Sequence, residues 1–245
     1  TDEYTTVDLV RIKENRILIV SKRYKGVLTH PGIYVYDIKT GKTENLLPED
    51  RYVIFHADFL GDQVVFLGTE KSTGLLTDNP KFYRIEKGEV KLWADPDISV
   101  RDTVGYDCKY GEGVAFKVFE EKLYFVSTGE RSSFLKSLDS QGSFSSLTGD
   151  NGAVHDFDLC PEGIAFCALR GMGLQELYLL TGGKEKQLTF FNKDYLSKKN
   201  IVPAETMVFQ NNGFNVHYVV LKPGNFDHSR KYPALLYIHG GAKVL

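Results

Sequence analysis

The chain has 245 residues, of which 42% are hydrophobic and 25% are charged, and its formal net charge is −2. This composition predicts a folded chain with a sizeable core, large enough for one large β domain or two smaller domains. The low net charge and the scattered Lys and Arg residues argue against a nucleic-acid partner. No apolar run reaches the ~20 residues that a membrane span requires, so we expect no membrane partner.

The three cysteines are Cys108, Cys160 and Cys167, and none belongs to a Cys-x-x-Cys sequence. An odd number of cysteines cannot all pair within one chain, and no charged-then-apolar leader opens the sequence. We therefore expect a reduced, cytoplasmic protein. Cys160 and Cys167 are spaced so that they can face each other across a hairpin, but we expect both to be small buried residues.

The first predicted elements lie in residues 16 to 38, which contain two runs of β-branched and aromatic residues separated by a loop. Residues 33 to 38 alternate with a period of two, which predicts a strand and not a helix. A tight turn at residues 40 to 42 then leads into a short outer strand that ends at Leu47.

The same order of inner strand, loop, strand, glycine turn and outer strand recurs three more times. The four copies close on Leu47, Trp93, Leu147 and Leu188. A period of roughly 40 to 50 residues is typical of β-propeller blades, each made of four antiparallel strands. A sandwich or barrel also contains short strands at regular spacing, but the repeated order favours an all-β propeller of about four blades.

The repeat ends near residue 191, and we divide the chain into three parts. Residues 1–191 are predicted to form propeller blades, and residues 192–203 a polar linker with a single helical turn. Residues 204–245 are predicted to form the truncated N-terminal strands of a further domain.

The third part begins with two short strands around an Asn-Asn-Gly turn at residues 211–213. The run "YPALLYI", residues 232–238, follows and is almost continuously apolar. Such a run predicts a strand that is buried on both faces of a larger sheet, and a strand of this kind needs neighbours.

Residues 187 to 241 include "QLTFFNKDYL" and "VFQNNGFNVHYVVLKPGNFDHSRKYPALLYIHGG". This stretch resembles the domain junction of the prolyl oligopeptidase family of serine peptidases, specifically its acylaminoacyl-peptidase branch. In that family a β-propeller precedes an α/β-hydrolase domain, which opens with two strands, a "KP…F…KYP" segment and a buried strand leading into His-Gly-Gly. Family members commonly have Pro after His-Gly-Gly, whereas this chain has Ala242.

The resemblance makes His239, Gly240 and Gly241 the candidate oxyanion-hole loop. Backbone N–H groups aimed at a developing oxyanion stabilise it by several kcal/mol, and glycines permit the close approach of backbone to substrate. His239 is expected to shape the loop by hydrogen bonding. In α/β-hydrolases the second donor follows the nucleophile, so this loop supplies half of the hole.

The catalytic triad is absent from these 245 residues, because no Gly-x-Ser-x-Gly sequence occurs. The nearest sequence is Ser72-Thr73-Gly74, in a propeller loop. The family places its Asp and His downstream of the nucleophile, so we expect this chain to be catalytically inactive alone. Since it begins at Thr1 without a methionine, we expect a fragment cut within a larger propeller.

Other residues offer little catalytic chemistry. The isolated histidines His30, His56, His155 and His217 show no spacing of a metal site and are expected to be surface or satisfied core residues. The acidic pair Glu120-Glu121 resembles the amine-binding pair of dipeptidyl peptidases, but its place before "KLYFV" predicts solvated residues of a hairpin turn. We expect neither a cofactor nor a metal.

The parent protein is therefore expected to be a serine peptidase that cleaves short or N-acylated peptides, with the propeller excluding folded proteins from the active site. One alternative is a complete, closed four-bladed propeller that acts as a binding module. Another is a fragment of a carboxylesterase, because His-Gly-Gly also occurs there. We also expect the fragment to self-associate through open sheet edges.

Overall fold

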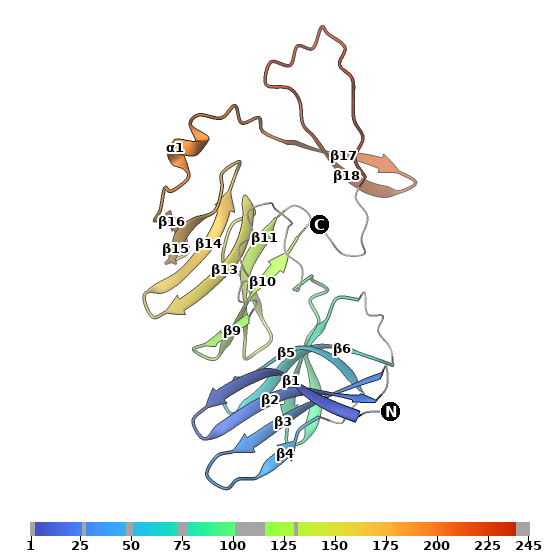
Figure 1. Cartoon of the computed structure of the whole chain (residues 1–245), viewed down its shortest axis with the longest axis vertical. Coiled ribbons are helices and arrows are strands. Elements are labelled where there is room, and N and C mark those ends of the chain that lie inside the picture. The colour runs from blue at the N-terminus through green and yellow to red at the C-terminus, as the bar shows by residue number, and fades with distance from the viewer. Residues whose placement is uncertain are drawn as a thin grey trace.

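The computed structural model describes residues 3–25, 28–47, 51–72, 78–100, 116–129 and 132–238. These residues form four four-stranded antiparallel units, one after another along the chain, followed by a short helix and a two-stranded hairpin (Figure 1). A single parallel pairing of Ser133 with Ala153 joins the last two units into one eight-stranded sheet. The all-β propeller architecture predicted from the sequence repeat is confirmed.

The four units are blades in which successive strands pair in chain order. Blade 1 contains β1 (Glu3–Lys13), β2 (Arg16–Lys25), β3 (Leu28–Asp37) and β4 (Thr43–Asn45). Blade 2 contains β5 (Tyr52–Leu60), β6 (Gln63–Glu70), β7 (Lys81–Glu86) and β8 (Glu89–Ala94). Blade 3 contains β9 (Phe116–Phe119), β10 (Lys122–Thr128), β11 (Ser133–Asp139) and β12 (Phe144–Ser146). Blade 4 contains β13 (Gly152–Cys160), β14 (Gly163–Arg170), β15 (Glu176–Thr181) and β16 (Lys184–Gln187).

Two-residue turns join many of these strands, as the sequence predicted. Positive φ angles occur at both residues in the turns Lys87-Gly88, Glu120-Glu121, Gly182-Gly183 and Asn212-Gly213. Such turns match the right-handed twist of the flanking strands. The prediction that Glu120-Glu121 is a hairpin turn is confirmed, since it connects β9 to β10.

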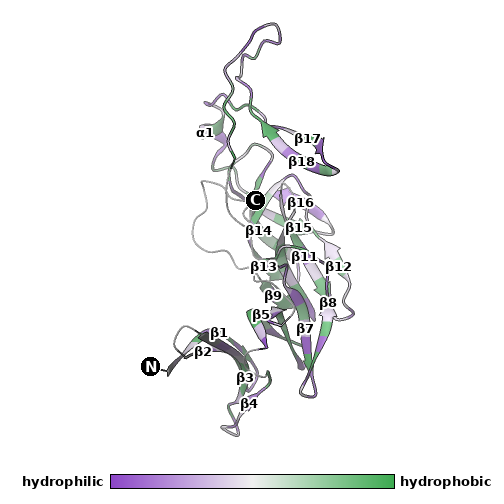
Figure 2. Cartoon of the chain, turned by 90° about the vertical axis from the view of Figure 1, so that its right-hand side faces the viewer, coloured by the Kyte–Doolittle hydropathy of each residue, from purple (hydrophilic) through white to green (hydrophobic). Residues whose placement is uncertain are grey.

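Apolar side chains are buried between consecutive blades, in three clusters. The first lies between blades 1 and 2 and includes Leu18 and Phe59; the second lies between blades 2 and 3 and includes Phe125; the third lies between blades 3 and 4 and includes Phe166. Figure 2 shows apolar residues along the strands of the blades. Each fully buried side chain of this size contributes about 1.5–3 kcal/mol, so stability comes from blade–blade packing.

The residues that close each blade reveal the order of packing. Leu47 and Trp93 are 1% and 8% exposed, and Leu147 packs against the third cluster. Each of these three residues closes one blade and is covered by the next. Leu188 closes blade 4 and is 41% exposed.

The array of blades is open. Within the described ranges, strand contacts link blade 1 to blade 2, blade 2 to blade 3 and blade 3 to blade 4, and no contact of similar extent links blade 1 to blade 4. Blade 1 and blade 4 lie toward opposite ends of the array in Figure 1 and in Figure 2. The alternative of a closed four-bladed ring therefore does not describe this chain.

Three of the inner strands contain a β-bulge at the same distance from their hairpin turn. The pairing shifts between Val7 and Leu9, between Ile54 and His56, and between Val154 and Asp156. The extra residues are Asp8, Phe55 and His155. A bulge bends the strand and redirects the side chains around it.

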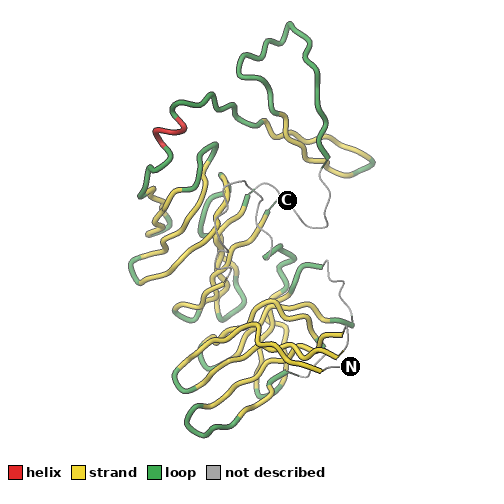
Figure 3. The backbone as a smooth tube through the Cα atoms, in the orientation of Figure 1, coloured by secondary structure: helices red, strands yellow, loops and turns green. Residues whose placement is uncertain are grey.

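After blade 4, helix α1 (Lys193–Leu196) leads to a hairpin of β17 (Glu205–Asn211) and β18 (Phe214–Val220). Figure 3 shows the segment that follows β18 as loop. The strand predicted for residues 232–238 is not formed, and Leu235 and Leu236 are 95% and 82% exposed. Extended backbone becomes a sheet strand only where a neighbouring strand accepts its hydrogen bonds, and this run has none beside it in the described part of the chain.

The cysteine predictions are corrected in part. Cys160 is exposed and Cys167 is half-buried, both are free, and Cys108 lies outside the described residues. Cys160 pairs across the β13–β14 hairpin with Gly163 and Cys167 pairs with Asp156, so the two thiols do not face each other. Cys160 lies beside the turn, where no core reaches it.

The helical part of the described chain is too short and too polar to cross a bilayer.

Candidate functional site

The predicted oxyanion loop, His239, Gly240 and Gly241, lies outside the described residues. The structure does describe the segment that leads to this loop, the junction between blade 4 and the linker, and the inner strands of the propeller. These three regions carry the geometry relevant to function.

The "KP…F…KYP" segment is held together by its own motif residues. Lys222 Nζ lies 2.7 Å from Glu205 Oε2, and the same ammonium group sits over the ring of Phe226, 5.2 Å from its centroid. Phe226 stacks on Tyr232 with 5.0 Å between ring centroids, and the backbone N–H of Asp227 donates to the Tyr232 hydroxyl oxygen at 3.0 Å. Since Tyr232 is the first residue of the apolar run 232–238, these contacts determine where that run leaves the loop.

Glu176, at the start of β15, fixes the linker to blade 4. Its Oε2 accepts hydrogen bonds from Thr189 Oγ1 at 2.5 Å and from the Phe191 N–H at 3.1 Å. Its Oε1 accepts from the backbone N–H and the side-chain amide of Asn192, at 2.8 and 3.1 Å. Burial of Glu176 raises the pKa of the carboxyl group, but the hydrogen bonds outweigh burial and lower the pKa below its usual value. Glu176 is therefore held as a carboxylate.

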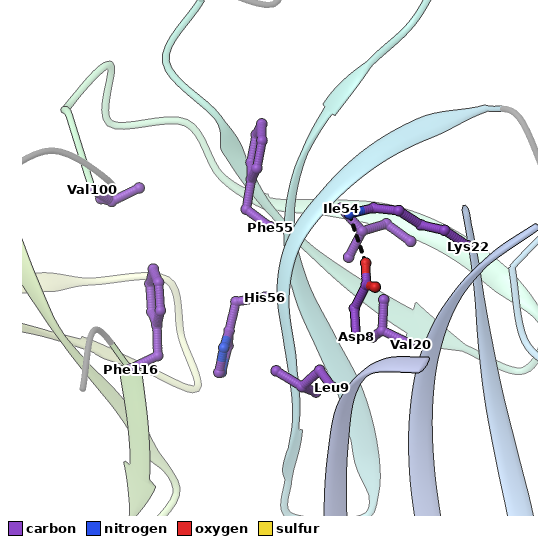
Figure 4. Close-up of a pocket in the computed structure, with 9 residues that line it drawn as sticks. All are labelled: Asp8, Leu9, Val20, Lys22, Ile54, Phe55, His56, Val100 and Phe116. Carbon is purple, nitrogen blue, oxygen red and sulfur yellow. Dashed lines mark ion pairs between the residues drawn. The ribbon is translucent and has the colours of Figure 1, made fainter. Parts of the chain in front are cut away.

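A cavity of about 500 Å³ lies at the inner strands of the first blades (Figure 4). Asp8 and Lys22 of blade 1 form an ion pair of 2.6 Å on one side of it. On the other side His56 of blade 2 stacks on Phe116 of blade 3, with 4.5 Å between ring centroids. The remaining lining residues are apolar: Leu9, Val20, Ile54, Phe55 and Val100.

His56 is the buried titratable group of this cavity. Its Nε2 lies 3.5 Å from Asp58 Oδ2, beyond ordinary hydrogen-bond length. Burial lowers the pKa of His56, and the nearby carboxylate of Asp58 only partly opposes this effect. The imidazole is therefore neutral near pH 7, and the expectation of a fully satisfied core histidine does not hold for His56.

Charged residues of opposite sign recur at the same place in successive inner strands. Arg11 Nε of blade 1 lies 3.2 Å from Asp58 Oδ2 of blade 2, and Lys117 Nζ of blade 3 lies 2.6 Å from Asp158 Oδ1 of blade 4. Each of the four residues lies two positions before the end of its inner strand. These two ion pairs link blade 1 to blade 2 and blade 3 to blade 4 near the ends of the inner strands.

Of the other three isolated histidines named above, His155 is buried and His217 is exposed, while His30 is half-buried. They belong to separate blades and to the C-terminal hairpin, so the structure does not bring them together. Within the described ranges, no three His, Cys, Asp or Glu residues gather as a metal site.

The sequence reasoning missed Glu176, the Asp8–Lys22 pair and the inter-blade ion pairs. The recurrence of Asp58 and Asp158 at one position of the repeat was a signal that could have identified them. Glu176 gave no local signal, because its partners lie 13 to 16 residues downstream, at the end of blade 4 and the start of the linker.

No protein-family model matches the chain. In sequence, it is 23% identical over 171 residues to the uncharacterized peptidase YuxL of Bacillus subtilis (strain 168), covering 66% of this chain and 26% of that protein. This match alone does not establish a family.

Solved structures match over most of the chain. The acylaminoacyl peptidase of Pyrococcus horikoshii has a TM-score of 0.70 at 20% identity, over 94% of this chain and 34% of that protein. An acylaminoacyl peptidase in complex with Z-Gly-Gly-Phe-chloromethyl ketone has a TM-score of 0.66 at 19% identity, over 87% and 31%.

A further match is the β-propeller domain of the trilobed protease from Pyrococcus furiosus, with a TM-score of 0.55 at 21% identity over 77% of this chain and 55% of that one. This chain thus spans about a third of the two acylaminoacyl peptidases. The predicted resemblance is confirmed at the level of structure: the chain has the propeller fold found in peptidases of the acylaminoacyl peptidase and prolyl oligopeptidase type.

Proposed function

We propose that this chain is part of a serine peptidase that cleaves short or N-acylated peptides, and that it supplies the propeller and the first segment of the catalytic domain. The observation that carries the proposal is the structural match to an acylaminoacyl peptidase over 94% of the chain, which takes in the region after the blades as well as the blades themselves. A free-standing propeller does not need the linker, the β17–β18 hairpin or the "KP…F…KYP" loop.

The role proposed for the blades is exclusion of large substrates. Packed blades form walls, and the ion pairs Arg11–Asp58 and Lys117–Asp158 hold neighbouring walls together near the axis. A short, flexible peptide can pass through such a structure, whereas a folded protein cannot without separating blades and exposing their apolar clusters.

The C-terminal segment is proposed to lead into the oxyanion hole. The contacts among Lys222, Phe226 and Tyr232 support this role, because they fix the start of the run that ends at His239. In the complete enzyme, residues 233–238 would be a strand inside the catalytic sheet, with Gly240 and Gly241 presenting backbone N–H groups to the developing oxyanion.

The same proposal makes the 245-residue chain inactive alone. Acyl transfer needs a nucleophile with an adjacent base, and this sequence has no Gly-x-Ser-x-Gly elbow to present one. An oxyanion loop without a nucleophile stabilises no transition state.

The test compares two proteins on two substrates. The 245-residue chain and the full product of its parent reading frame are assayed with an N-acetylated dipeptide p-nitroanilide and with p-nitrophenyl acetate. We expect the full product to cleave the blocked peptide and the 245-residue chain to match the buffer rate on both substrates. Hydrolysis of the ester alone by the full product would indicate an esterase, and a reading frame that ends at Leu245 would overturn the proposal.

A further inference from the structure

The two ends of the blade array present sheet faces of the kind that other blades bury. We call the side of a blade that faces the preceding blade its leading face, and the side that faces the next blade its trailing face. The inner hairpins end at the pairs Lys13–Arg16, Leu60–Gln63 and Cys160–Gly163, so counting back from these pairs aligns blades 1, 2 and 4 residue by residue.

The aligned leading faces have the same chemistry in all three blades. In blade 2 the face consists of Ala57, Phe59, Val64, Phe66, Tyr83 and Ile85, all in the cluster shared with blade 1. In blade 4 it consists of Phe157, Leu159, Ile164, Phe166, Tyr178 and Leu180, which lie in the cluster shared with blade 3 or pack against it. In blade 1 the equivalent positions are Val10, Ile12, Ile17, Ile19, Tyr34 and Tyr36.

The leading face of blade 1 differs from the others in exposure. Val10 and Ile12 are 47% and 69% exposed, whereas the equivalent Ala57 and Phe59 of blade 2 are 0% and 4% exposed. An apolar face with this repeat pattern is built to pack against the trailing face of another blade.

The trailing face of blade 4 is the matching free surface. Its residues Cys167 and Leu177 are equivalent to Val20 and Ile33 of blade 1, which are buried against blade 2. Leu188 shows the same difference. Its backbone N–H donates to the Leu177 carbonyl as that of Leu46 donates to the Ile33 carbonyl, yet Leu188 is 41% exposed whereas Leu46 packs against the cluster shared with blade 2.

The charges also continue across this pair of faces. Along the inner strands the equivalent residues run Arg11, Asp58, Lys117 and Asp158, which alternate in sign. A blade 1 placed after blade 4 puts Arg11 next to Asp158, and so extends the alternation. The side chain of Asp158 is 76% exposed, which leaves room for a second cation.

From this complementarity we propose that the trailing face of blade 4 binds the leading face of blade 1 in a second copy of this chain. Two copies related by a two-fold axis make the contact twice and close a ring of eight blades, within the range known for propellers. The inference rests on the propeller fold and not on the proposed peptidase activity, so it can fail or hold independently of that activity.

The first test is the mass of the 245-residue chain in solution, measured by sedimentation equilibrium. This chain is used because any additional blade in a longer polypeptide competes for the same faces. We expect a dimer, with Ile12→Lys and Leu188→Lys each giving a monomer at concentrations where the unmodified chain is dimeric. Both side chains are exposed in the single chain, so each variant is expected to keep the unmodified circular dichroism spectrum and melting temperature.

The second test mixes the two variants. Ile12→Lys retains an intact blade 4 face and Leu188→Lys retains an intact blade 1 face, so the mixture is expected to form a one-to-one complex through a single contact. A contact between two identical faces cannot be restored in this way.

The matched control is Leu236→Lys in the exposed C-terminal run, which is expected to leave the dimer intact. If the unmodified chain is a monomer, the proposal is wrong. It is also wrong if Leu236→Lys abolishes association while Ile12→Lys does not, because association then occurs through the C-terminal run.

Discussion

Strand β6 of blade 2 and the run 233–238 near the C-terminus are both continuous apolar sequences, but they have opposite environments. Residues 64 to 69 of β6 are all buried, because blade 2 packs between blades 1 and 3 and these two blades cover the two faces of the strand. Residues 233–238 have no sheet beside them, and Leu235 to Ile238 are at least 80% exposed. An apolar run specifies a buried strand only together with the surfaces that cover it.

The first prediction compares the two regions by truncating one side chain in each. Phe125 is fully buried between blades 2 and 3, so Phe125→Ala is expected to lower the free energy of unfolding by about 3–5 kcal/mol. The matched control, Leu236→Ala, removes an exposed side chain and is expected to change it by less than ~0.5 kcal/mol. Urea unfolding followed by tryptophan fluorescence measures both. Equal effects would mean that residues 233–238 are packed in solution.

The second prediction concerns the link between the two regions. Glu176→Gln removes a carboxylate that accepts four hydrogen bonds from Thr189, Phe191 and Asn192, and is expected to destabilise this attachment of the linker by about 1–3 kcal/mol. Hydrogen exchange at the Phe191 and Asn192 amides is expected to become faster, while exchange in blades 1 and 2 stays unchanged. Unchanged exchange at these two amides would show that the linker is held by other contacts.

The same carboxylate predicts a pH dependence. The folded state holds the pKa of Glu176 below the ordinary value, so its contribution is present above the unfolded-state pKa and is lost as pH falls through the folded-state pKa. Protection of the Asn192 amide, meaning its exchange rate relative to the unfolded chain at the same pH, should therefore fall in acid in the unmodified chain. Glu176→Gln should lack this pH dependence of protection.

The third prediction concerns the blade interface at His56. Burial lowers the pKa of His56 in the fold, so below about pH 6.5 the unfolded chain binds a proton that the folded chain resists. Stability is therefore expected to fall as pH decreases from 7 toward 5. His56→Phe should flatten this part of the curve, and His217→Phe, at an exposed hairpin position, should not. A flat curve for the unmodified chain would contradict the prediction.

The smallest expected effect is at the β9–β10 turn. Glu120 and Glu121 have φ angles of 45° and 56°, a region that Asn and Gly adopt at lower cost. The double change Glu120→Asn with Glu121→Gly is expected to stabilise the chain by about 1 kcal/mol. The reverse change, Asn212→Glu with Gly213→Glu, should weaken the β17–β18 hairpin by a similar amount, measured by exchange of the hairpin amides. If the change at Glu120 and Glu121 lowered stability instead, the acidic side chains would be stabilising their turn.

The parts of the fold that could be read from sequence are those set by local pattern. Period-two alternation and turns such as Lys87-Gly88 depend on neighbouring residues, and the closing residues Leu47 and Trp93 recur at blade spacing. Contacts between distant segments could not be read. Glu176 bonds to residues far downstream, and Asp58 depends on Arg11 in the preceding blade.

The candidate site could be predicted only as a motif. His239 to Gly241 fit the oxyanion loop by resemblance, and the contacts that Phe226 and Tyr232 make before it follow from packing of aromatic rings, which sequence spacing does not reveal. The strand predicted for residues 232–238 failed because sequence pattern reports the environment for which a segment is suited, not the one it has.

The β-bulges at Asp8, Phe55 and His155 also show how the blades correspond to one another. Each lies five residues before the end of its inner strand, and the matching position of blade 3 lies outside the described residues. Three unlike residues occupy one irregular position, so the backbone irregularity recurs without a fixed side chain. Bulge position therefore identifies equivalent positions of the blades where residue identity does not.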